Sequence, residues 1–367
     1  MKTIKSLIEK KLYQLIIIAL LITSCSDDDN DIRYESDGLL DYGALILNEG
    51  TFGNSNASLS FESFTHDTVI GDIYREANGG NISIGDVLQD AVITDNLALF
   101  VLNNSDKIEV TNSQDFTWKK TIDNLHNPRF ATTHNNKLFV SQWRSAEGSV
   151  AVIDLNNLEI IENIETDQYG AEGILSHNNY IWVANSGGFG TDNTISVIDP
   201  ETYQVVNTIK TKDEPTHFTV DKNSDIWAVC SGSQIWNQDW TEIIEETPSY
   251  LIKIDPNSQE VVREIKISDS KHANHIGINK DKSIIYTMNS LGIFKMRIED
   301  EQLPVEPFIG ESGYSFSVNP FNGDIYLTDA KDFASPGTIS IYDGNSGELK
   351  RTITDNIGLI PSKIIFR

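Results

Sequence analysis

Short runs of alternating apolar and polar residues recur along most of the chain, separated by polar turns. Residues 194–198 read Thr-Ile-Ser-Val-Ile. After the segment Asp199-Pro200-Glu201-Thr202, residues 205–209 read Val-Val-Asn-Thr-Ile. A period of two is typical of half-buried strands, and aspartate and proline favour turns. The pattern therefore predicts antiparallel hairpins and requires no helix beyond residue 22.

The hairpins belong to a longer repeat. Residues 128–140 match residues 171–183 at a constant offset, and similar units begin near Leu88, Pro128, Ala171, Pro215, Ala273, Gly313 and Pro361. Four strands in about 40–45 residues is the size of a β-propeller blade. We expect residues 44–367 to form an all-β, seven-bladed propeller with four-stranded antiparallel blades. The C-terminal strand 361–366 should close the ring by completing the first blade, which hides the open sheet edges.

Several residues at repeated positions have structural explanations. Trp182 and Trp227 occupy the aromatic position of the second strand, which predicts core packing between blades. Cys230 ends a strand-like run and should be a small buried residue. The aspartates that end the third strands should bind backbone N–H groups of the following turns; they are Asp154, Asp199, Asp255 and Asp343.

The first 24 residues predict an export signal. Four lysines precede the apolar run from Leu15 to Ile22, which is too short for a permanent membrane helix. An uncleaved anchor is the alternative. The segment ending Thr23-Ser24-Cys25 resembles a bacterial lipobox, which implies cleavage before Cys25 and lipidation of that cysteine. Residues 25–43 should then be a disordered acidic tether.

The acidic residues 27–31 resemble the signal that sends lipoproteins to the exterior of the outer membrane in Bacteroidetes-type bacteria, with periplasmic retention as the alternative. The whole chain has 28 basic and 54 acidic residues, a formal charge of −26. Such a surface repels nucleic acid and anionic lipid, which argues against a DNA-binding role. Solubility alone would also explain the charge.

Two resemblances refine the expectation. Residues 183–209 resemble the YVTN-type propeller repeat, which implies the fold but no particular activity. Residues 47–60 resemble the opening motif of surface lipoprotein propellers of Bacteroidetes-type gut bacteria. The characterised members of that group bind cobalamin and pass it to a TonB-dependent outer-membrane transporter. The resemblance implies such a ligand and partner for a monomeric propeller that has no cofactor of its own.

The loops on one face of a propeller surround the central channel, and here they are long and rich in aromatic and amide side chains. His217 and His275 fall at equivalent strand entries, where imidazole suits hydrogen bonding or metal ligation. The candidate ligand-binding residues are Asn48, Glu49, Phe52, Asn54, Asp90, Arg129, Trp143, Arg144, Glu172, Phe189, His217, Trp236, Trp240, His275 and Tyr314.

No catalytic motif such as a nucleophile elbow or a His-Glu-x-x-His helix is present in the sequence. Asp90 and Glu172 could act as a carboxylate pair, and Glu172, Asn274 and Asp90 offer metal-ligand residue types. We therefore favour a small-molecule binding protein. The alternatives are a protein or glycan adhesion module and a metal-dependent hydrolase or lyase.

Overall fold

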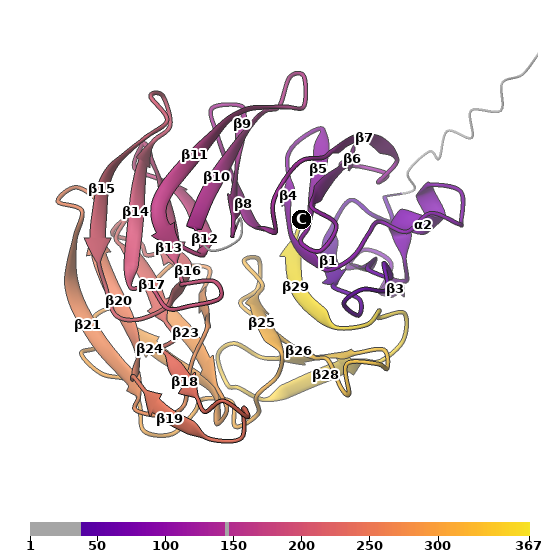
Figure 1. Cartoon of the computed structure of the whole chain (residues 1–367). Helices are drawn as coiled ribbons and strands as arrows, with labels where there is room; N and C mark the ends of the chain where they lie inside the picture. The colour runs from indigo at the N-terminus through magenta and orange to yellow at the C-terminus, as the bar shows by residue number, and fades with distance from the viewer. Residues whose placement is uncertain (1–37, 144–146) are drawn as a thin grey trace, which may run out of the picture. The chain divides into compact units, whose positions relative to one another are not determined.

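The computed structural model describes residues 38–143 and 147–367. In this part of the chain, seven antiparallel sheets follow one another around a ring, as Figure 1 shows. The predictions for the export signal, the acidic tether, Cys25 and Arg144 concern residues outside the described ones. The expected fold class, an all-β seven-bladed propeller, is confirmed.

Each blade runs from an innermost strand at the channel to an outermost strand at the rim. The first four blades contain, in spatial order, β29 (Pro361–Phe366), β1 (Gly43–Asn48), β2 (Ser58–Ser63) and β3 (Thr68–Ile70); β4 (Leu88–Ile93), β5 (Leu97–Leu102), β6 (Lys107–Asn112) and β7 (Trp118–Ile122); β8 (Pro128–His134), β9 (Lys137–Gln142), β10 (Glu147–Asp154) and β11 (Glu159–Tyr169); β12 (Ala171–His177), β13 (Tyr180–Asn185), β14 (Thr194–Asp199) and β15 (Gln204–Lys210).

The last three blades follow the same order. They contain β16 (Pro215–Val220), β17 (Ile226–Cys230), β20 (Ser249–Asp255) and β21 (Glu260–Ser268); β22 (His275–Ile278), β23 (Ile284–Asn289) and β24 (Gly292–Arg297); β25 (Ser315–Val318), β26 (Ile325–Asp329), β27 (Thr338–Tyr342) and β28 (Leu349–Ile353). The sixth blade thus has three strands, and an isolated bridge between Ile293 and Ile309 takes the place of the fourth.

The ring closes as the sequence predicts. The C-terminal strand β29 pairs antiparallel with β1, with Ile46 opposite Ile364 and Leu45 opposite Ile365. The ends of the propeller are also joined directly, because the backbone N–H of Gly43 donates to the carbonyl of Arg367 at 3.0 Å. The first and last strands of the domain therefore share one sheet, and closure depends on the final residues of the chain.

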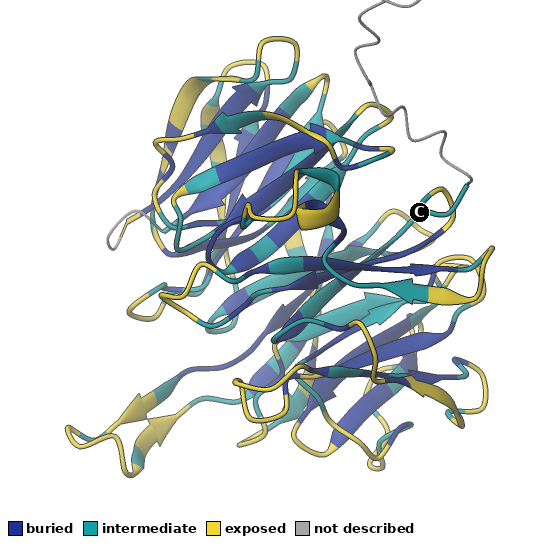
Figure 2. Ribbon diagram, turned by 90° about the vertical axis from the view of Figure 1, so that its right-hand side faces the viewer, coloured by how far each residue is buried: buried dark blue, intermediate teal, exposed yellow. Residues whose placement is uncertain are grey.

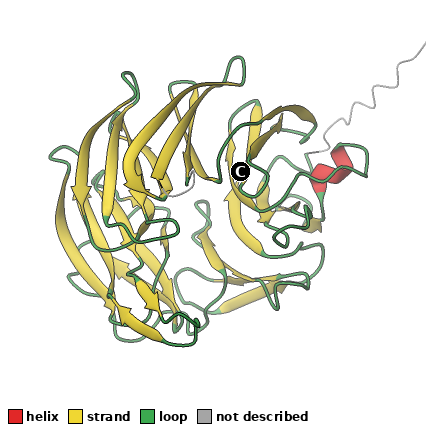
Figure 3. Cartoon of the chain, viewed as in Figure 1, coloured by secondary structure: helices red, strands yellow, loops and turns green. Residues whose placement is uncertain are grey.

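Two elements depart from the repeat. A short helix, α2 (Ile73–Ala77), follows blade one, and Figure 3 shows it as a red turn in an otherwise stranded structure. A two-stranded hairpin, β18 (Gln234–Trp236) and β19 (Ile243–Glu246), extends from blade five between its second and third strands. No helix among the described residues is long and apolar enough to cross a membrane.

The core lies between neighbouring blades. Trp182 and Trp227 are fully buried there, each in a cluster of aliphatic side chains from two adjacent sheets. Removing one such indole would cost about 3–5 kcal/mol. Cys230 is also buried in this layer, and burial raises the pKa of its thiol to about 12. Both core predictions are confirmed, and the thiol stays protonated and packed.

The repeated aspartates cap turns as expected. The Asp199 carboxylate accepts hydrogen bonds from the backbone N–H groups of Glu201 and Thr202, and these bonds lower its pKa. Asp154, Asp255 and Asp343 accept from the residue two positions later at 2.7–2.9 Å. They therefore fix the connection between the third and fourth strands rather than bind metal.

Candidate functional site in the central channel

The innermost strands enter the channel with a shared irregularity. In β4, Leu88 lies opposite Leu102, but Asp90 lies opposite Val101, so Gln89 is an extra residue in the register. Strands β8, β12, β16 and β29 show a register shift at the same place. A β-bulge re-aims a side chain where pairing is interrupted. The residues at these entries, among them Gln89, Arg129, Glu172 and Ser362, line the channel.

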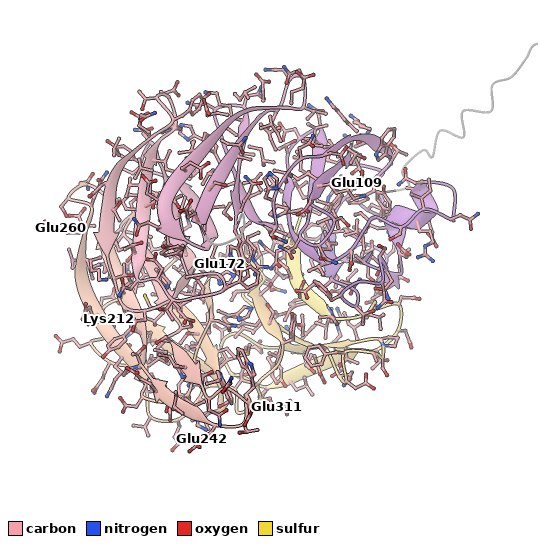
Figure 4. All side chains as sticks on the ribbon, viewed as in Figure 1. Glu109, Glu172, Lys212, Glu242, Glu260 and Glu311 are labelled. Carbon is pink, nitrogen blue, oxygen red and sulfur yellow. The ribbon has the colours of Figure 1, made fainter. Side chains whose placement is uncertain are left out.

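A cavity of about 650 Å³ occupies the channel, and we call it the channel cavity. Its lining combines a hydrogen-bonding group with a group of rings. The hydrogen-bonding residues are Glu49, Gln89, Arg129, Glu172, Asn274, Tyr314, Ser362 and Lys363, and the rings are Phe130, His217, His275 and Phe316. Figure 4 labels Glu172 near the middle of the ring of blades.

Arg129 and Glu172 form the central ion pair. The guanidinium donates from Nε to Oε2 at 2.9 Å and from Nη2 to Oε1 at 2.8 Å, and Nη1 donates to Gln89 Oε1 at 2.9 Å. Trp143 Nε1 donates to Glu172 Oε2 at 2.8 Å, and the guanidinium lies 4.3 Å from the centroid of the Trp143 ring. Bidentate geometry and ring stacking hold the arginine in one orientation.

Glu172 and Trp143 are one pair of a carboxylate and an aromatic residue, and Glu49 and Tyr314 form a second such pair. The phenol donates to Glu49 Oε2 at 2.9 Å. Burial raises the pKa of Glu49, while the Tyr314 hydrogen bond and the charge of Arg129 oppose the rise in part. Part of the Glu49 population therefore becomes a neutral acid, able to donate a hydrogen bond into the cavity, at a higher pH than for an ordinary glutamate.

Each carboxylate–aromatic pair leads outward to an exposed phenyl ring. Phe189 meets the edge of Trp143 with 5.4 Å between ring centroids, and Phe333 meets Tyr314 at 5.8 Å in the same T-shaped geometry. The two phenyl residues are 78% and 53% exposed. Phe333 has a φ of 61°, a costly conformation for an aromatic residue. These rings offer apolar surface to a bound molecule.

Four rings form a continuous wall of the cavity. Phe130 meets His217 at 4.9 Å, His217 stacks on His275 at 5.4 Å with an interplanar angle of 18°, and His275 lies 6.3 Å from Phe316. Blade four contributes no ring here because Gly173 stands at its entry, where a Cβ would lie 2.0 Å from the carbonyl oxygen of Thr216.

The two imidazoles of this wall are neutral at physiological pH. Burial lowers the pKa of His217 to about 4, with the Lys363 charge adding to the effect, and lowers that of His275 to about 3. His275 Nδ1 lies 2.5 Å from Asn274 Oδ1, but His217 Nδ1 is buried without a hydrogen-bond partner. This nitrogen is a buried polar atom left unsatisfied behind the wall of the cavity.

A second cation near the centre of the cavity, Lys363, is paired as well, whereas Lys280 and Lys282 are exposed residues of the lining. Lys363 forms an ion pair with the buried carboxylate of Asp90, whose other oxygen accepts from the backbone N–H of Ala131 at 2.9 Å. Asp90 thus lies behind the lining and anchors Lys363. The carboxylates of Asp90 and Glu172, considered above as a catalytic pair, are each already bound to a cation.

The candidate residues from the sequence fall into three groups. Glu49, Arg129, Glu172, His217, His275 and Tyr314 line the channel cavity together. Trp143, Phe189 and Asp90 contact that lining, as described above. The others are placed elsewhere: Asn48 is buried in blade one and donates to Ser58 and Ser60, Phe52 and Asn54 are exposed in the following loop, and Trp236 and Trp240 belong to the β18–β19 hairpin.

The residues that the sequence did not single out are Gln89, Phe130, Phe316, Phe333, Ser362 and Lys363. Gln89 was missed because the bulge turns it, rather than Asp90, into the channel, and single-sequence patterns do not show bulges. Ser362 and Lys363 could have been found, since Pro361 is equivalent to Pro128 and Pro215 at other entries. Nothing in the sequence pairs Phe333 with Tyr314.

The described residues contain no group of three or more His, Cys, Asp or Glu side chains that could hold a metal ion. His217 and His275 stack face to face, and this parallel arrangement is unlike the convergent one that two ligands of a single ion adopt. The lining offers hydrogen-bonding groups and ring surfaces.

The fold and the channel define a β-propeller with a ligand-sized central cavity. The chain belongs to the family described as a domain of unknown function, DUF5074, whose profile matches residues 42–367. No curated protein matches the sequence.

Solved structures share the fold at low sequence identity. A quinonprotein alcohol dehydrogenase-like protein of Bacteroides thetaiotaomicron is 15% identical with a TM-score of 0.64, covering 89% of this chain and 78% of its own. A Bacteroides uniformis protein named as a 6-phosphogluconolactonase is 13% identical with a TM-score of 0.63, covering 89% and 100%. Hydrazine synthase of Kuenenia stuttgartiensis is 14% identical with a TM-score of 0.54, covering 70% and 77%. At such identities the likeness concerns the fold alone.

Proposed function

We propose that this protein is a lipid-anchored binding protein of the outer cell surface that captures a small molecule in the channel cavity. Cys25 is the proposed site of lipidation, and a TonB-dependent outer-membrane transporter is the proposed recipient of the ligand. A corrinoid such as cobalamin is the first candidate ligand. The proposal combines the export signal predicted for the first 24 residues, the resemblance of residues 47–60 and the composition of the cavity.

One observation carries the binding function: the cavity has the size of a ligand site, yet both of its central cations are already paired. A volume of about 650 Å³ lies within the range of about 300–1,000 Å³ for small-molecule pockets. Arg129 is bound to Glu172 and Lys363 to Asp90. A ligand that meets Arg129 or Lys363 with a charge of its own would have to break one of these pairs, and leaving a buried charge unpaired costs about 3–5 kcal/mol.

The part of the preferred ligand that reaches these two pairs is therefore uncharged, with a ring system and several hydrogen-bonding groups. Its polar groups would meet Asn274 and Gln89. Its apolar ring surface would lie against the aromatic wall and the exposed Phe189 and Phe333. A corrinoid, which is a macrocycle carrying neutral amide arms, has this chemistry, and its outer parts would rest on the two phenyl rings.

Calorimetric titration of the purified protein with cyanocobalamin tests the ligand. Saturable binding at micromolar concentrations supports the corrinoid, and a derivative in which one amide is replaced by a carboxylate should bind at least about tenfold more weakly. If neither compound releases or absorbs heat, the corrinoid is excluded. A panel of uncharged and charged ring compounds then tests the preference for uncharged ligands independently.

The anchor is tested separately in cells. Metabolic labelling with an alkyne fatty acid should tag the protein, and Cys25→Ala should abolish the tag. Protease added to intact cells should degrade the wild-type protein if it faces outward. Protection of the protein until the outer membrane is opened would contradict the surface location and favour periplasmic retention.

An adhesion module and a metal-dependent hydrolase or lyase are the competing functions. For the enzyme, turnover that depends on an added metal and disappears in Glu172→Gln would support catalysis. The hairpin of blade five is the specific observation in favour of a protein contact, and it is independent of the cavity.

A further inference from the structure

The hairpin of blade five, which we call the hairpin arm (residues 231–249), is the most protruding feature of the propeller. It contains β18 and β19 and is longer than the connections that the other blades have between their second and third strands. Figure 2 shows it as the yellow, exposed hairpin that reaches beyond the blades at the lower left, and Figure 1 places β18 and β19 at the lower edge of the ring. Nothing in the ring closure or the cavity requires it.

The arm has a defined conformation. At its tip, Asn237 organises the turn: its backbone N–H donates to the carbonyl of Glu242 at 2.9 Å, and its side chain binds Thr241 through two contacts of 2.9 Å. Trp240 is held in the turn with a φ of 57° and donates its backbone N–H to Asn237. A tryptophan in the left-handed region is strained, so the turn presents this indole at a conformational cost.

The base of the arm is fixed to the neighbouring blades. The backbone N–H of Ser231 donates to the carbonyl of Glu214 at 2.9 Å. His272 lies between blades five and six, with Nδ1 2.7 Å from the Ser231 carbonyl oxygen and Nε2 3.2 Å from Glu246 Oε2. These contacts stabilise a two-stranded hairpin that would be marginal by itself in water.

The arm exposes its large apolar side chains. Trp240 is 77% exposed and Ile244 64%, and Ile235 and Trp236 also face solvent. Tryptophan is the residue most enriched among the energetic anchors of protein interfaces, and clustered exposed apolar side chains mark contact surfaces. Because each indole buries about 150–250 Å² in an interface, the arm supplies several hundred square ångströms of contact, enough for a transient complex.

The negative charge of the arm indicates which kind of surface it can bind. Its ionisable residues are all acidic, namely Asp239, Glu242, Glu245 and Glu246, and residues 231–249 contain no lysine, arginine or histidine. A second copy of this acidic chain and an anionic lipid surface would both be repelled. A basic surface would be attracted, and the attraction would weaken with salt.

We propose that the hairpin arm is a docking element for a partner protein whose surface offers an apolar groove bordered by lysine and arginine side chains. Trp240 and Trp236 enter the groove, and Glu242 and Glu245 meet its basic border. The inference stands whether or not the channel cavity binds a ligand, because the two surfaces share no residue.

The test is site-specific photo-crosslinking in cells that naturally make the protein, using the full-length chain with p-benzoylphenylalanine at position 240. The control carries the same group at position 305, an exposed position on the connection after β24. The expected result is one discrete protein adduct from position 240 that is absent from position 305. It should fall at least about fivefold when Glu242→Lys and Glu245→Lys are combined with the crosslinker, or when salt is raised to 0.5 M.

Folding of the charge-reversed variant is checked by its unfolding transition, which should match that of the wild type. Three outcomes would overturn the inference: adducts that do not exceed those of position 305, adducts to lipid or to a second copy of the chain, or a protein adduct insensitive to both charge reversal and salt. A failed cyanocobalamin titration leaves this result unaffected, so the two proposals fail separately.

Discussion

Arg129 and Glu172 join blades three and four through two parallel hydrogen bonds of 2.9 and 2.8 Å at the entry of their innermost strands. Their side chains are only 16% and 8% exposed. The pair lines the channel cavity, so it shapes the cavity and cancels the charge of both partners. Because both side chains are largely buried, breaking this pair should cost more free energy than breaking an ion pair on the surface.

Breaking this pair should destabilise the protein strongly. Glu172→Ala leaves the Arg129 charge unpaired and removes the acceptor of Trp143, so the free energy of unfolding should fall by about 3 kcal/mol in urea titrations. The double variant Arg129→Met with Glu172→Leu removes both charges and should recover most of the loss. A single variant within about 0.5 kcal/mol of the wild type would show that the pair is dispensable.

The stacked imidazoles should make the fold acid-sensitive. Each histidine has a pKa near 6.5 when unfolded but about 4 or 3 when folded, so between pH 6.5 and 4 the unfolded chain binds more protons. The free energy of unfolding should therefore fall as the pH falls through this window. His217→Gln with His275→Gln should reduce that loss by about 2 kcal/mol, allowing for the water that the cavity admits.

The matched control for the histidine prediction is His66→Gln, because His66 is exposed on a turn of blade one. It should leave the pH dependence unchanged. Equal acid sensitivity of the double variant and the control, measured by unfolding at pH 4.5 and 7, would contradict the assignment of the effect to the channel wall.

Glu214 should have the opposite pH dependence. Burial raises its pKa to about 7, above the value of 4.5 for an ordinary glutamate. Between these values the folded state binds more protons, so the free energy of unfolding should fall as the pH rises from 4.5 to 7. Glu214→Gln should remove this slope and gain roughly 1 kcal/mol at pH 8, after discounting for solvent exposure.

Exposed Glu260 provides the control for Glu214, since Glu260→Gln should leave the slope unchanged. The measurement is the urea midpoint of each variant at pH 5 and pH 8. A Glu214→Gln variant that is less stable than the wild type at pH 8 would show that the ionised carboxylate stabilises the fold.

Ring closure should depend on how one strand, β29, packs between blades one and seven. Ile364 of β29 is 4% exposed and packs with Ile46, Ile339 and Tyr326 from blades one and seven. Ile364→Ala should lower the free energy of unfolding by about 2–4 kcal/mol. Ile161→Ala, on the exposed rim of blade three, should change it by at most about 0.5 kcal/mol. Similar losses in both variants would contradict a special role for closure.

The repeat made most of the architecture predictable. Alternation in residues 194–209 and the equivalence of Pro361 with Pro128 and Pro215 were enough to expect seven blades and closure by the C-terminal strand. The three-stranded sixth blade was not predictable, because residues 298–310 lack a clear alternating pattern. The hairpin arm was expected only as a long loop, since its strands are too short for periodicity to appear.

The site was predictable in part. Arg129, Glu172 and Tyr314 were found because they sit at repeated strand entries beside long loops. The pairing of Arg129 with Glu172 depends on the distance between two blades, which no single sequence encodes. Asn48 was a candidate because it begins the long loop expected in blade one, but it is the last residue of β1, and its side chain is buried within the blade.

The most direct measurement is ligand affinity in variants of the cavity and its rim. Once a ligand is identified in the titrations, Phe189→Ala and His217→Leu should each weaken it by at least about tenfold, about 1.4 kcal/mol. Leu349→Ala, on the outermost strand of blade seven, should bind with wild-type affinity. If all three variants bind equally well, the ligand lies outside the channel cavity and the central claim is wrong.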